Sequence, residues 1–506
     1  MLRAGVFGNS IVLETDDISI KGLLEYRYIE NKYNFMIKKW GNQVVKGKIY
    51  DRKMKDQKTG TTFYQVGIGF AGYLINVLKP YLPSDDFDQI VNSMRREHYR
   101  TIPFKELRDY QNEDVLVLLR YKFGLFSCPT SYGKTQVISV LANYFYSDEK
   151  KKVLLIAPGK KARDELVKRI YNLYGIEVST KLGVGRIQAL ITNGILNKKE
   201  MKDPDKSQEW VNELQSFDVV LCDEVEYCIN PGGMWIFDNC TGAEYRFGFS
   251  GTADKSSAEM ITFQNGLSKN VAENRDLVKY FGSSIVYRLP VKYDIDMITV
   301  KTIALDSLYF DEKEFEAGNV YTNILTRIWT DDEICKVVVN LVKTYPKLFI
   351  PINNLQGVIN EWIDKWFLKK FRILLISHEG YVYYDLNGNK SNLTLQEASD
   401  YIARGEVDVI PSTSSGYRAL SFDSLENIFL IQGNIAGVVL QCIGRVARGT
   451  HMNIISLDSM FGSRIPVYSK GQDERNEMIK SYYKYCNITE STILESKLIG
   501  YKKPEN

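Results

Sequence analysis

The chain of 506 residues carries a net charge of +3, a hydrophobic fraction of 44% and a charged fraction of 25%. These fractions are those of a globular protein, and a chain of this length normally divides into about three domains because single cores stop growing near ~250–300 residues. A net charge so close to zero excludes a strong overall field for a polyanion, so any nucleic-acid surface must be a local groove.

Cysteine usage and apolar runs exclude further classes of protein. The seven cysteines form no Cys-x-x-Cys pair and the chain has three histidines, so we expect buried reduced thiols in a cytoplasm and no structural zinc site. No apolar run approaches the ~18 residues of a membrane span, and the N-terminus lacks the basic-then-apolar pattern of a signal peptide. The sequence therefore predicts a cytoplasmic protein with no membrane partner.

Residues 1–100 predict a small β-rich (α+β) domain, because short alternating runs such as Ser10–Thr15 and Thr62–Val66 are typical of strands. This part holds 16 lysines and arginines against 11 carboxylates, and the resulting charge of +5 exceeds that of the whole chain. A basic hairpin here would hold a nucleic-acid backbone, and a solvated hairpin tip is an equally good interpretation. The basic residues assigned to such a contact are Lys46, Lys48, Arg52 and Lys53.

The sequence predicts two α/β lobes, at residues 101–288 and 289–475. Short apolar runs such as Val153–Ala157 and Tyr245–Ser250 alternate with amphipathic helical stretches, and Leu348–Ile352 and Ile428–Ile431 continue the pattern in the second half. Fully apolar strands alternating with helices are typical of a parallel sheet covered on both faces. The predicted fold class is α/β, with two tandem parallel-sheet lobes after the small domain. Residues 476–506 predict a short helix with a polar tail.

The segment Cys128–Thr135 lies between an apolar run and a helical stretch. A strand, a loop of small residues, Gly-Lys-Thr and a helix form a phosphate cradle, because the loop and helix N–H groups attract an anion. Lys134 would reach the β and γ phosphates, and the Thr135 hydroxyl would bind Mg²⁺. Cys128 stands where such loops usually have glycine, and a chance Gly-Lys-Thr explains the segment alone equally well. The loop residues assigned to the nucleotide are Pro129, Thr130, Ser131, Tyr132 and Gly133.

An acidic run, Asp223–Glu226, follows a second apolar strand. Carboxylates at the carboxyl end of a parallel strand lie beside the phosphate loop in an open α/β sheet. Asp223 would hold Mg²⁺, and Glu224 would orient or deprotonate the attacking water. An acidic turn after a strand is the alternative interpretation. A strand that ends in Asp-Glu and follows a phosphate loop along the chain is, however, rarely a coincidence.

Two further segments supply hydroxyl and guanidinium groups. Arg445 and Arg448 lie three residues apart on one face of a predicted helix, with Gln441 a turn earlier, and the planar arginine fork suits phosphate charge. A surface helix with two arginines is the alternative. Small residues also end another apolar strand, where they would sense the γ-phosphate, although such a run is common loop chemistry. They are Ser250, Gly251 and Thr252.

In their order along the chain, the phosphate loop, Asp223–Glu226, Ser250–Ala253 and Gln441–Arg448 resemble motifs I, II, III and VI of superfamily 2 helicases. The resemblance covers about residues 100–475 and implies that the two lobes are RecA-like. Lys134, Asp223, Glu224 and the two arginines would then be its catalytic residues. The first 100 residues are similar to the small N-terminal module of UvsW-type phage recombination helicases.

The resemblance also implies contacts with adenine and with a nucleic-acid backbone. Leu107–Gln111 is similar to the glutamine motif, which implies that Arg108 and Gln111 contact the base. Segments similar to motif Ia, to the later strand-contacting motif of the first lobe, and to motifs IV and V follow the strands. The backbone contacts that they imply are Pro158, Gly159, Lys160, Thr192, Asn193, Asn353 and Thr413.

The function implied is that of an ATP-dependent DNA helicase or translocase that remodels branched DNA in phage recombination, repair or replication, in the host cytoplasm. ATP and Mg²⁺ would be its cofactors, branched or forked DNA its partner, and we expect a monomer. An RNA helicase is one alternative, since such motors read the backbone, and a nucleotide-gated clamp is another. Glu226 in motif II and Tyr417–Arg418 in motif V depart from common patterns of the family.

Overall fold

The computed structural model shows two compact units, Met1–Arg288 and Leu289–Asn506, each with its own parallel sheet. Across the parts of the chain that the structure describes, no helix combines the length and apolar character that a membrane crossing needs. Of residues 26–34, 39–46, 161, 197, 284, 287, 305, 333, 458, 459 and 494 the structure describes the backbone alone. The described residues are 2–34, 39–128, 132–193, 195–197, 203–251, 275–282, 284–287, 297–305, 331–352, 360–377, 380–413, 425–430, 443, 451–459, 475–477, 479–480, 483 and 486–494.

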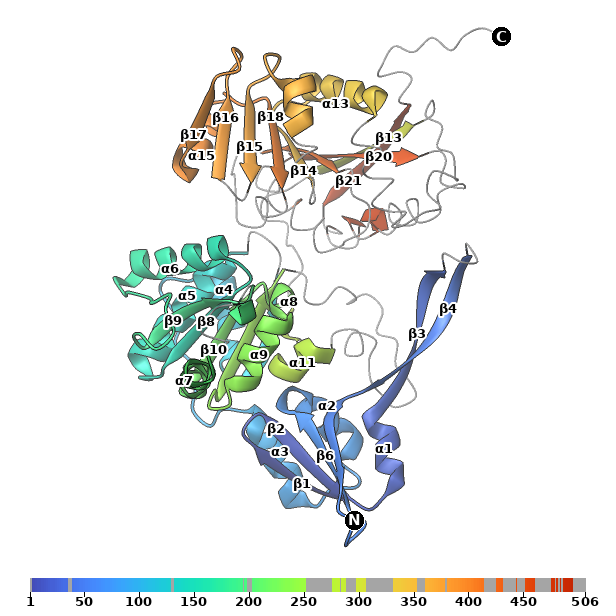
Figure 1. The fold of residues 1–506 in the computed structure, drawn as a ribbon, viewed down its shortest axis with the longest axis vertical. Coiled ribbons are helices and arrows are strands. Elements are labelled where there is room, and N and C mark those ends of the chain that lie inside the picture. Colours follow the sequence, from blue (N-terminus) through green and yellow to red (C-terminus); the bar gives the residue numbers. More distant parts are fainter. Residues whose placement is uncertain are drawn as a thin grey trace. The chain divides into compact units, whose positions relative to one another are not determined.

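The N-terminal domain is built on a four-stranded antiparallel sheet in the order β1-β2-β6-β5 (Figure 1). Ile11 and Leu13 of β2 are fully buried, as expected for a strand with one face on a core that three helices share. A separate antiparallel ribbon of β3 and β4 extends from this domain. The elements are β1 (Leu2–Phe7), β2 (Ser10–Thr15), α1 (Ile18–Leu24), β3 (Glu25–Asn34), β4 (Lys39–Lys48), β5 (Tyr50–Lys55), β6 (Thr62–Gly67), η1 (Ile68–Phe70), α2 (Ala71–Leu78) and α3 (Ser84–Met94).

The first lobe is a six-stranded sheet in the order β12-β7-β11-β10-β8-β9, and every pair is parallel. The predicted strands Val153–Ala157 and Tyr245–Ser250 are present with these bounds. The elements are α4 (Asp109–Leu118), β7 (Phe123–Ser127), α5 (Lys134–Asn143), η2 (Tyr144–Asp148), β8 (Val153–Ala157), α6 (Lys160–Tyr174), β9 (Ile187–Ile191), η3 (Ile195–Asn197), α7 (Pro204–Gln215), β10 (Val219–Asp223), α8 (Val225–Cys228), α9 (Pro231–Asn239), β11 (Tyr245–Ser250), α11 (Arg275–Phe281) and β12 (Ser284–Tyr287).

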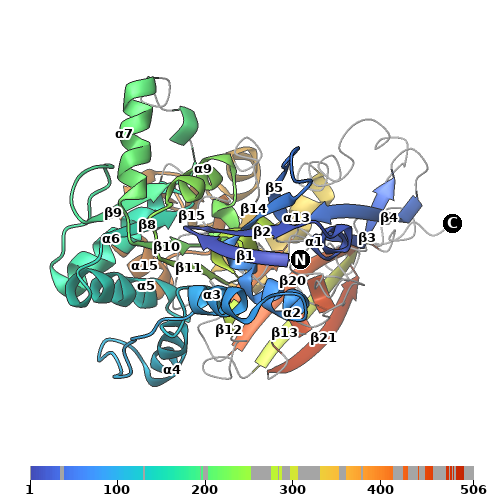
Figure 2. The same cartoon turned by 90° about the horizontal axis from the view of Figure 1, so that it is seen from below.

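Helices cover both faces of this sheet. Alternate strand residues such as Leu155 and Leu221 pack with α4, α5 and α6, whereas Leu154 and Val220 pack with α7, α8, α9 and α11. Figures 1 and 2 show these two helical layers on either side of the strands. Burial on both faces explains why the strands are apolar throughout rather than alternating. The predicted fold class is thus confirmed for this lobe.

The second unit is a nine-stranded sheet in the order β17-β16-β15-β18-β14-β19-β20-β13-β21, parallel from β15 to β21 and antiparallel at β16 and β17. One face packs on α13 and the other on α15, so it too is a covered α/β sheet. Its elements are β13 (Met297–Leu305), α13 (Asp332–Thr344), β14 (Leu348–Ile352), η6 (Ile363–Phe367), β15 (Ile373–Ser377), β16 (Gly380–Tyr384), β17 (Lys390–Leu393), α15 (Leu395–Ala403), β18 (Val409–Thr413), β19 (Asn427–Leu430), β20 (His451–Ser459) and β21 (Asn487–Leu494).

The C-terminal region corrects one sequence prediction. Residues 476–506 were expected to form a helix with a polar tail, and a helical turn does occur at 475–477 and 479–480. The stretch Asn487–Leu494, however, is strand β21, which pairs in parallel with β13 at the edge of the second sheet. Its threonines and isoleucines favour a strand, and the edge position tolerates the polar side chains between them.

The N-terminal domain packs tightly on the first lobe through α11. Phe123 and Val278 of the lobe belong to the core of the N-terminal domain. Gly69 of η1 lies so close to α11 that a Cβ there would be 1.8 Å from the Val278 carbonyl oxygen. Only glycine, which has no Cβ, allows this close approach of the two backbones, and the approach joins the N-terminal domain to the first lobe.

Gly69→Ala should therefore destabilise the protein by about 1–3 kcal/mol, because α11 must move to admit one methyl group. Gly22→Ala in α1 is the matched control, since nothing lies within 4 Å of its added Cβ. The control should be neutral or stabilising by up to about 1 kcal/mol, because alanine favours helix. Thermal and urea unfolding measure both variants, and equal stability of the two would show that the packing at Gly69 is looser than described.

Candidate functional site

Three neighbouring parallel strands bring predicted site residues to one edge of the first sheet. β11 lies between β7 and β10, with Ser250 paired to Ser127 and Asp223 paired to Phe249. The carboxyl ends of the three strands therefore lie side by side, which is where open α/β sheets bind ligands. The Cys128 N–H donates to the Ser250 carbonyl oxygen at 3.0 Å and fixes the start of the loop to β11.

The loop after β7 enters α5 through Gly133. This residue has a φ of +93°, a left-handed conformation that glycine adopts without strain. A Cβ at this position would also lie 2.7 Å from Gln111 Nε2. Because α5 begins at Lys134, the unpaired N–H groups of its first turn lie directly after the loop. The turn at Gly133 and this helix end together offer N–H groups suited to a phosphate.

Helix α4 holds this loop by side-chain hydrogen bonds. Gln111 is 3% exposed, its Nε2 donates to the Tyr132 carbonyl oxygen at 2.7 Å, and its Oε1 accepts the Arg108 N–H at 3.0 Å. The Tyr132 hydroxyl donates to Asp114 Oδ2 at 2.6 Å, and its ring packs edge-on against Phe126. The Gln111 amide thus fixes the loop backbone, a role that the sequence did not reveal. Its contact with adenine stays a prediction.

Lys134 and Glu224 form an ion pair at this edge. Lys134 Nζ donates to Glu224 Oε1 at 2.7 Å, and the two side chains are 10% and 14% exposed. Burial opposes the charge of Lys134, but Glu224 and Asp223 outweigh it and raise the pKa of its ammonium. Glu224 also has a φ of +45°, an uncommon conformation for a residue with a side chain. Backbone strain of this kind is found mostly at functional sites.

Asp223 lies beside this pair as a buried carboxyl group. It is 7% exposed, and its Oδ1 accepts the Glu224 N–H at 3.0 Å. Burial raises the pKa of Asp223 to about 7, with a further increase from Glu224 that Lys134 opposes. The positive charge around the ionised carboxylate is therefore too small to stabilise it, and a divalent cation would supply the missing charge.

The described residues contain no group of three or more His, Cys, Asp or Glu that could hold a metal ion by themselves. They do fit Mg²⁺ bound through one carboxylate, one hydroxyl and phosphate oxygens, which is the usual arrangement where Mg²⁺ accompanies a nucleotide. Asp223 ends β10 and Thr135 is the second residue of α5, so both lie at the phosphate cradle.

Cys128, at the position of the usual first glycine, is 1% exposed, and burial raises the pKa of its thiol. It therefore acts as a small hydrophobic residue and not as a nucleophile. The six cysteines that the structure describes are free thiols, and five of them are buried, as the sequence predicted.

The predicted backbone-contacting residues of the first lobe follow β8 and β9. Pro158 and Gly159 precede Lys160, which is the exposed first residue of α6, and Asn193 after β9 is exposed as well. Because all strands of this sheet run parallel, these residues lie at the same carboxyl edge as the phosphate cradle. Their contact with nucleic acid stays a prediction.

Thr192 differs from these neighbours because it is 1% exposed and its hydroxyl accepts a hydrogen bond from Asn230 Nδ2 at 2.9 Å. Asn230 also donates to the Tyr227 carbonyl oxygen at 2.9 Å and caps α9 by accepting the Gly233 N–H at 3.0 Å. The sequence did not identify Asn230 as part of the site. The signal for it was Asn-Pro-Gly-Gly, an N-cap followed by proline in the first helical turn.

The basic stretch of the N-terminal domain is divided between two elements and does not form a single hairpin. Lys46 and Lys48 end β4, whereas Arg52 and Lys53 lie in β5, because buried Ile49 anchors the chain between them. The ammonium groups of Lys48 and Lys53 lie 4.9 and 5.5 Å from the ring centroids of two tyrosines.

The remaining predicted residues are distributed as follows. Ser250 and Gly251 are buried at the end of β11, and Thr413 ends β18 in the second unit, where it is 6% exposed. Those that lie outside the described residues are Pro129, Thr130, Ser131, Thr252, Asn353, Gln441, Arg445 and Arg448.

No family model and no curated protein matches this chain. Among solved structures, T4 UvsW aligns with 98% of this chain and 99% of its own, at 13% identity and a TM-score of 0.39. Dbp5 of S. cerevisiae bound to RNA and ADP BeF3 aligns over 77% and 90%, at 13% identity and 0.47. The DUF1998 helicase MrfA bound to DNA aligns over 74% and 52%, at 14% identity and 0.44. The matches thus include UvsW and other superfamily 2 helicases, the group that the motifs resemble, and at these identities they concern the fold alone.

The raised pKa of Asp223 predicts that the stability of the metal-free protein falls as pH rises. The carboxyl group of Asp223 has a pKa of ~3.9 in the unfolded chain and of about 7 in the folded protein. Because the folded state binds the proton more tightly, the free energy of unfolding decreases as pH rises from the lower value to the higher one. Asp223→Asn should stabilise the protein more at pH 8 than at pH 5, by about 2–3 kcal/mol. Unfolding in EDTA measures this difference, and equal gains at both pH values would contradict it.

Proposed function

We propose that this chain is an ATP-dependent helicase or translocase of superfamily 2, which couples ATP hydrolysis to movement along nucleic acid. The observation that supports this most strongly is the Lys134–Glu224 ion pair beside buried Asp223, at the edge where α5 begins. An ion pair with a structural role alone would not need the left-handed glycine turn at Gly133, typical of phosphate loops, next to it. Lysine, carboxylates and helix N-terminus are the parts that hold and hydrolyse a nucleoside triphosphate.

The ion pair gives each partner a role in this chemistry. Lys134 exchanges Glu224 for the β and γ phosphate oxygens, which offer it more negative charge than one carboxylate does. Glu224 then accepts a hydrogen bond from the attacking water and orients it toward the γ-phosphorus. Asp223 and Thr135 would hold Mg²⁺, which would neutralise charge on the phosphates. Gln111 keeps the loop in shape through its bond to the chain at Tyr132.

We assign the nucleotide to the lobe of residues 101–288 and the completing arginines to residues 289–475. Arg445 and Arg448 would stabilise charge on the γ-phosphate, with Gln441 beside them, while Ser250, Gly251 and Thr252 would report its presence. Hydrolysis would then require both lobes to close on one nucleotide, and this requirement ties it to lobe motion. Asn353 and Thr413 would contact the strand from the second lobe.

Branched DNA is the substrate that we propose for this motor. The support is the charge of +5 on residues 1–100, next to a first lobe whose exposed Lys160 and Asn193 lie at the nucleotide edge. Contacts of this kind are to phosphates and do not read sequence. The basic N-terminal domain would add duplex contacts that convert translocation into fork regression or branch migration. The comparison of DNA and RNA substrates below would also identify RNA as the substrate.

Lys134→Ala and Glu224→Gln should each lower kcat for ATP hydrolysis by at least ~10²-fold, since one removes a phosphate contact and the other the group that orients water. Lys152→Ala is the matched control, because Lys152 pairs with Glu213 at the amino end of β8, away from this site. Steady-state phosphate release measures all three. If either site variant hydrolyses ATP as fast as the control, the site assignment is wrong.

A substrate panel tests the nucleic-acid assignment. We expect forked and four-way DNA junctions to stimulate ATP hydrolysis more than single-stranded DNA, and single-stranded DNA more than RNA. Stopped-flow phosphate release at a fixed ionic strength is the measurement, because electrostatic binding depends steeply on salt. Stronger stimulation by RNA would replace the DNA assignment with an RNA one, and nucleotide binding without stimulated hydrolysis would indicate a clamp.

A further inference from the structure

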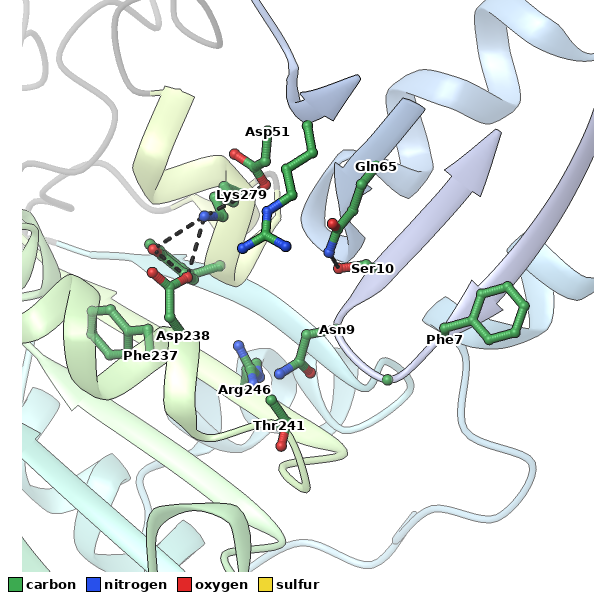
Figure 3. A pocket seen from close by; sticks show the side chains of 13 residues that line it. Phe7, Asn9, Ser10, Asp51, Gln65, Phe237, Asp238, Thr241, Arg246 and Lys279 are labelled. Carbon is green, nitrogen blue, oxygen red and sulfur yellow. Dashed lines mark hydrogen bonds and ion pairs between the residues drawn. The ribbon is translucent and has the colours of Figure 1, made fainter. Parts of the chain in front are cut away.

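A polar pocket of about 450 Å³ lies between the N-terminal domain and the first lobe (Figure 3). The β1–β2 turn, β5 and β6 form one wall, and α9, α11 and the start of β11 form the other. Pockets of this size at a junction of domains are common ligand sites. The tight packing at Gly69 holds the two walls in place.

This pocket is separate from the nucleotide site. It is lined by Arg246, the second residue of β11, whereas Ser250 at the other end of the same strand lies at the phosphate cradle. Four residues of strand separate the two positions by about 13 Å. Ligands of open α/β sheets normally bind at the carboxyl edge, so a pocket at the amino edge needs another explanation.

Arg246 is a buried guanidinium without a carboxylate partner. It is 3% exposed, its Nη2 donates to the Cys240 carbonyl oxygen, and its Nε lies 3.4 Å from the Ala243 carbonyl oxygen. No carboxylate among the described residues lies within ion-pair distance of it, and burial lowers its pKa. Burying such a charge costs several kcal/mol unless a negative group compensates it.

The carboxylates that line the pocket are already paired. Lys279 Nζ lies 3.4 Å from Asp51 and 3.2 Å from Asp238, and Arg275 lies 2.8 Å from Asp51. In Figure 3 Lys279 points to Asp238, while Arg246 lies apart from them. Arg52 of β5 also lines the pocket, is exposed, and has no ion-pair partner among the described residues. Two guanidinium groups, one from each domain, are therefore left without a carboxylate.

We propose that this pocket binds a phosphate group, held by Arg52 of the N-terminal domain and Arg246 of the first lobe. Guanidinium groups bind phosphate through parallel hydrogen bonds, and contacts from both domains give the two-sided grip that such an anion requires. Phe7 also lines the pocket and is 67% exposed, but in Figure 3 its ring points away from Arg246, so the guanidinium groups carry the recognition. A phosphate of a nucleic-acid strand fits these features, and a free phosphate compound shares the chemistry.

The test uses Arg52→Gln and, as its matched control, Lys55→Gln, in the full chain carrying Lys134→Ala so that the nucleotide site does not report phosphate. Both glutamine variants remove one exposed positive charge from β5, but only Arg52 lines the pocket. The probes are inorganic phosphate, by thermal shift at constant ionic strength, and single-stranded oligonucleotides with a 5′-phosphate or a 5′-hydroxyl, by fluorescence anisotropy without ATP.

Arg52→Gln should weaken binding of at least one probe by ~10-fold or more, whereas Lys55→Gln should change it less than ~2-fold. A loss confined to the 5′-phosphorylated strand assigns a strand end, a loss with both strands assigns an internal phosphodiester, and a loss with inorganic phosphate alone assigns a small phosphate compound. Equal effects of the two variants on every probe would overturn the proposal. Because no ATP is present, that result would leave the proposed motor function untouched.

Discussion

The parallel pairing of β7, β11 and β10 is the constraint on which both sites of the first lobe depend. Because the three strands are neighbours and run in one direction, Lys134 and Glu224 meet although 90 residues separate them in the chain. The hydrogen bond from Cys128 N–H to the Ser250 carbonyl oxygen extends this register into the loop. The same strand β11 carries Arg246 at its other end, so one sheet has the candidate nucleotide site at its carboxyl edge and the polar pocket at its amino edge.

Buried charge without sufficient compensation marks both sites. At the carboxyl edge, Lys134 is matched by Glu224, yet burial, and after it the charge of Glu224, raises the pKa of the neighbouring Asp223 to about 7. At the amino edge, the partners of Arg246 among the residues that the structure describes are carbonyl oxygens. A buried charge that lacks a partner of opposite charge destabilises the folded protein. A bound ligand of opposite charge removes this cost. We therefore propose ligands of opposite charge at the two edges, a cation for Asp223 and an anion for Arg246.

The sequence predicted the strands of both lobes well. Short, fully apolar runs such as Val153–Ala157 are typical of strands that are buried on both faces of a parallel sheet. It was wrong at Asn487–Leu494, where an edge strand has too few apolar residues to be distinguished from a tail. It also could not show that Gln111 binds the loop at Tyr132, or that Asn230 binds Thr192, since these contacts join residues 21 and 38 positions apart. Pairings of this kind are set by the fold and leave no periodic signal.

A crystal structure of this chain with Mg²⁺ and ADP-beryllium fluoride would show whether Lys134 and Glu224 belong to an ATP-hydrolysing site. We predict that Lys134 Nζ leaves Glu224 and contacts the phosphate groups, with Asp223 and Thr135 at the metal ion. Glu224 should then face the beryllium fluoride group through a water molecule. A nucleotide bound elsewhere in the chain, with the 2.7 Å pair between Lys134 and Glu224 intact, would contradict the account.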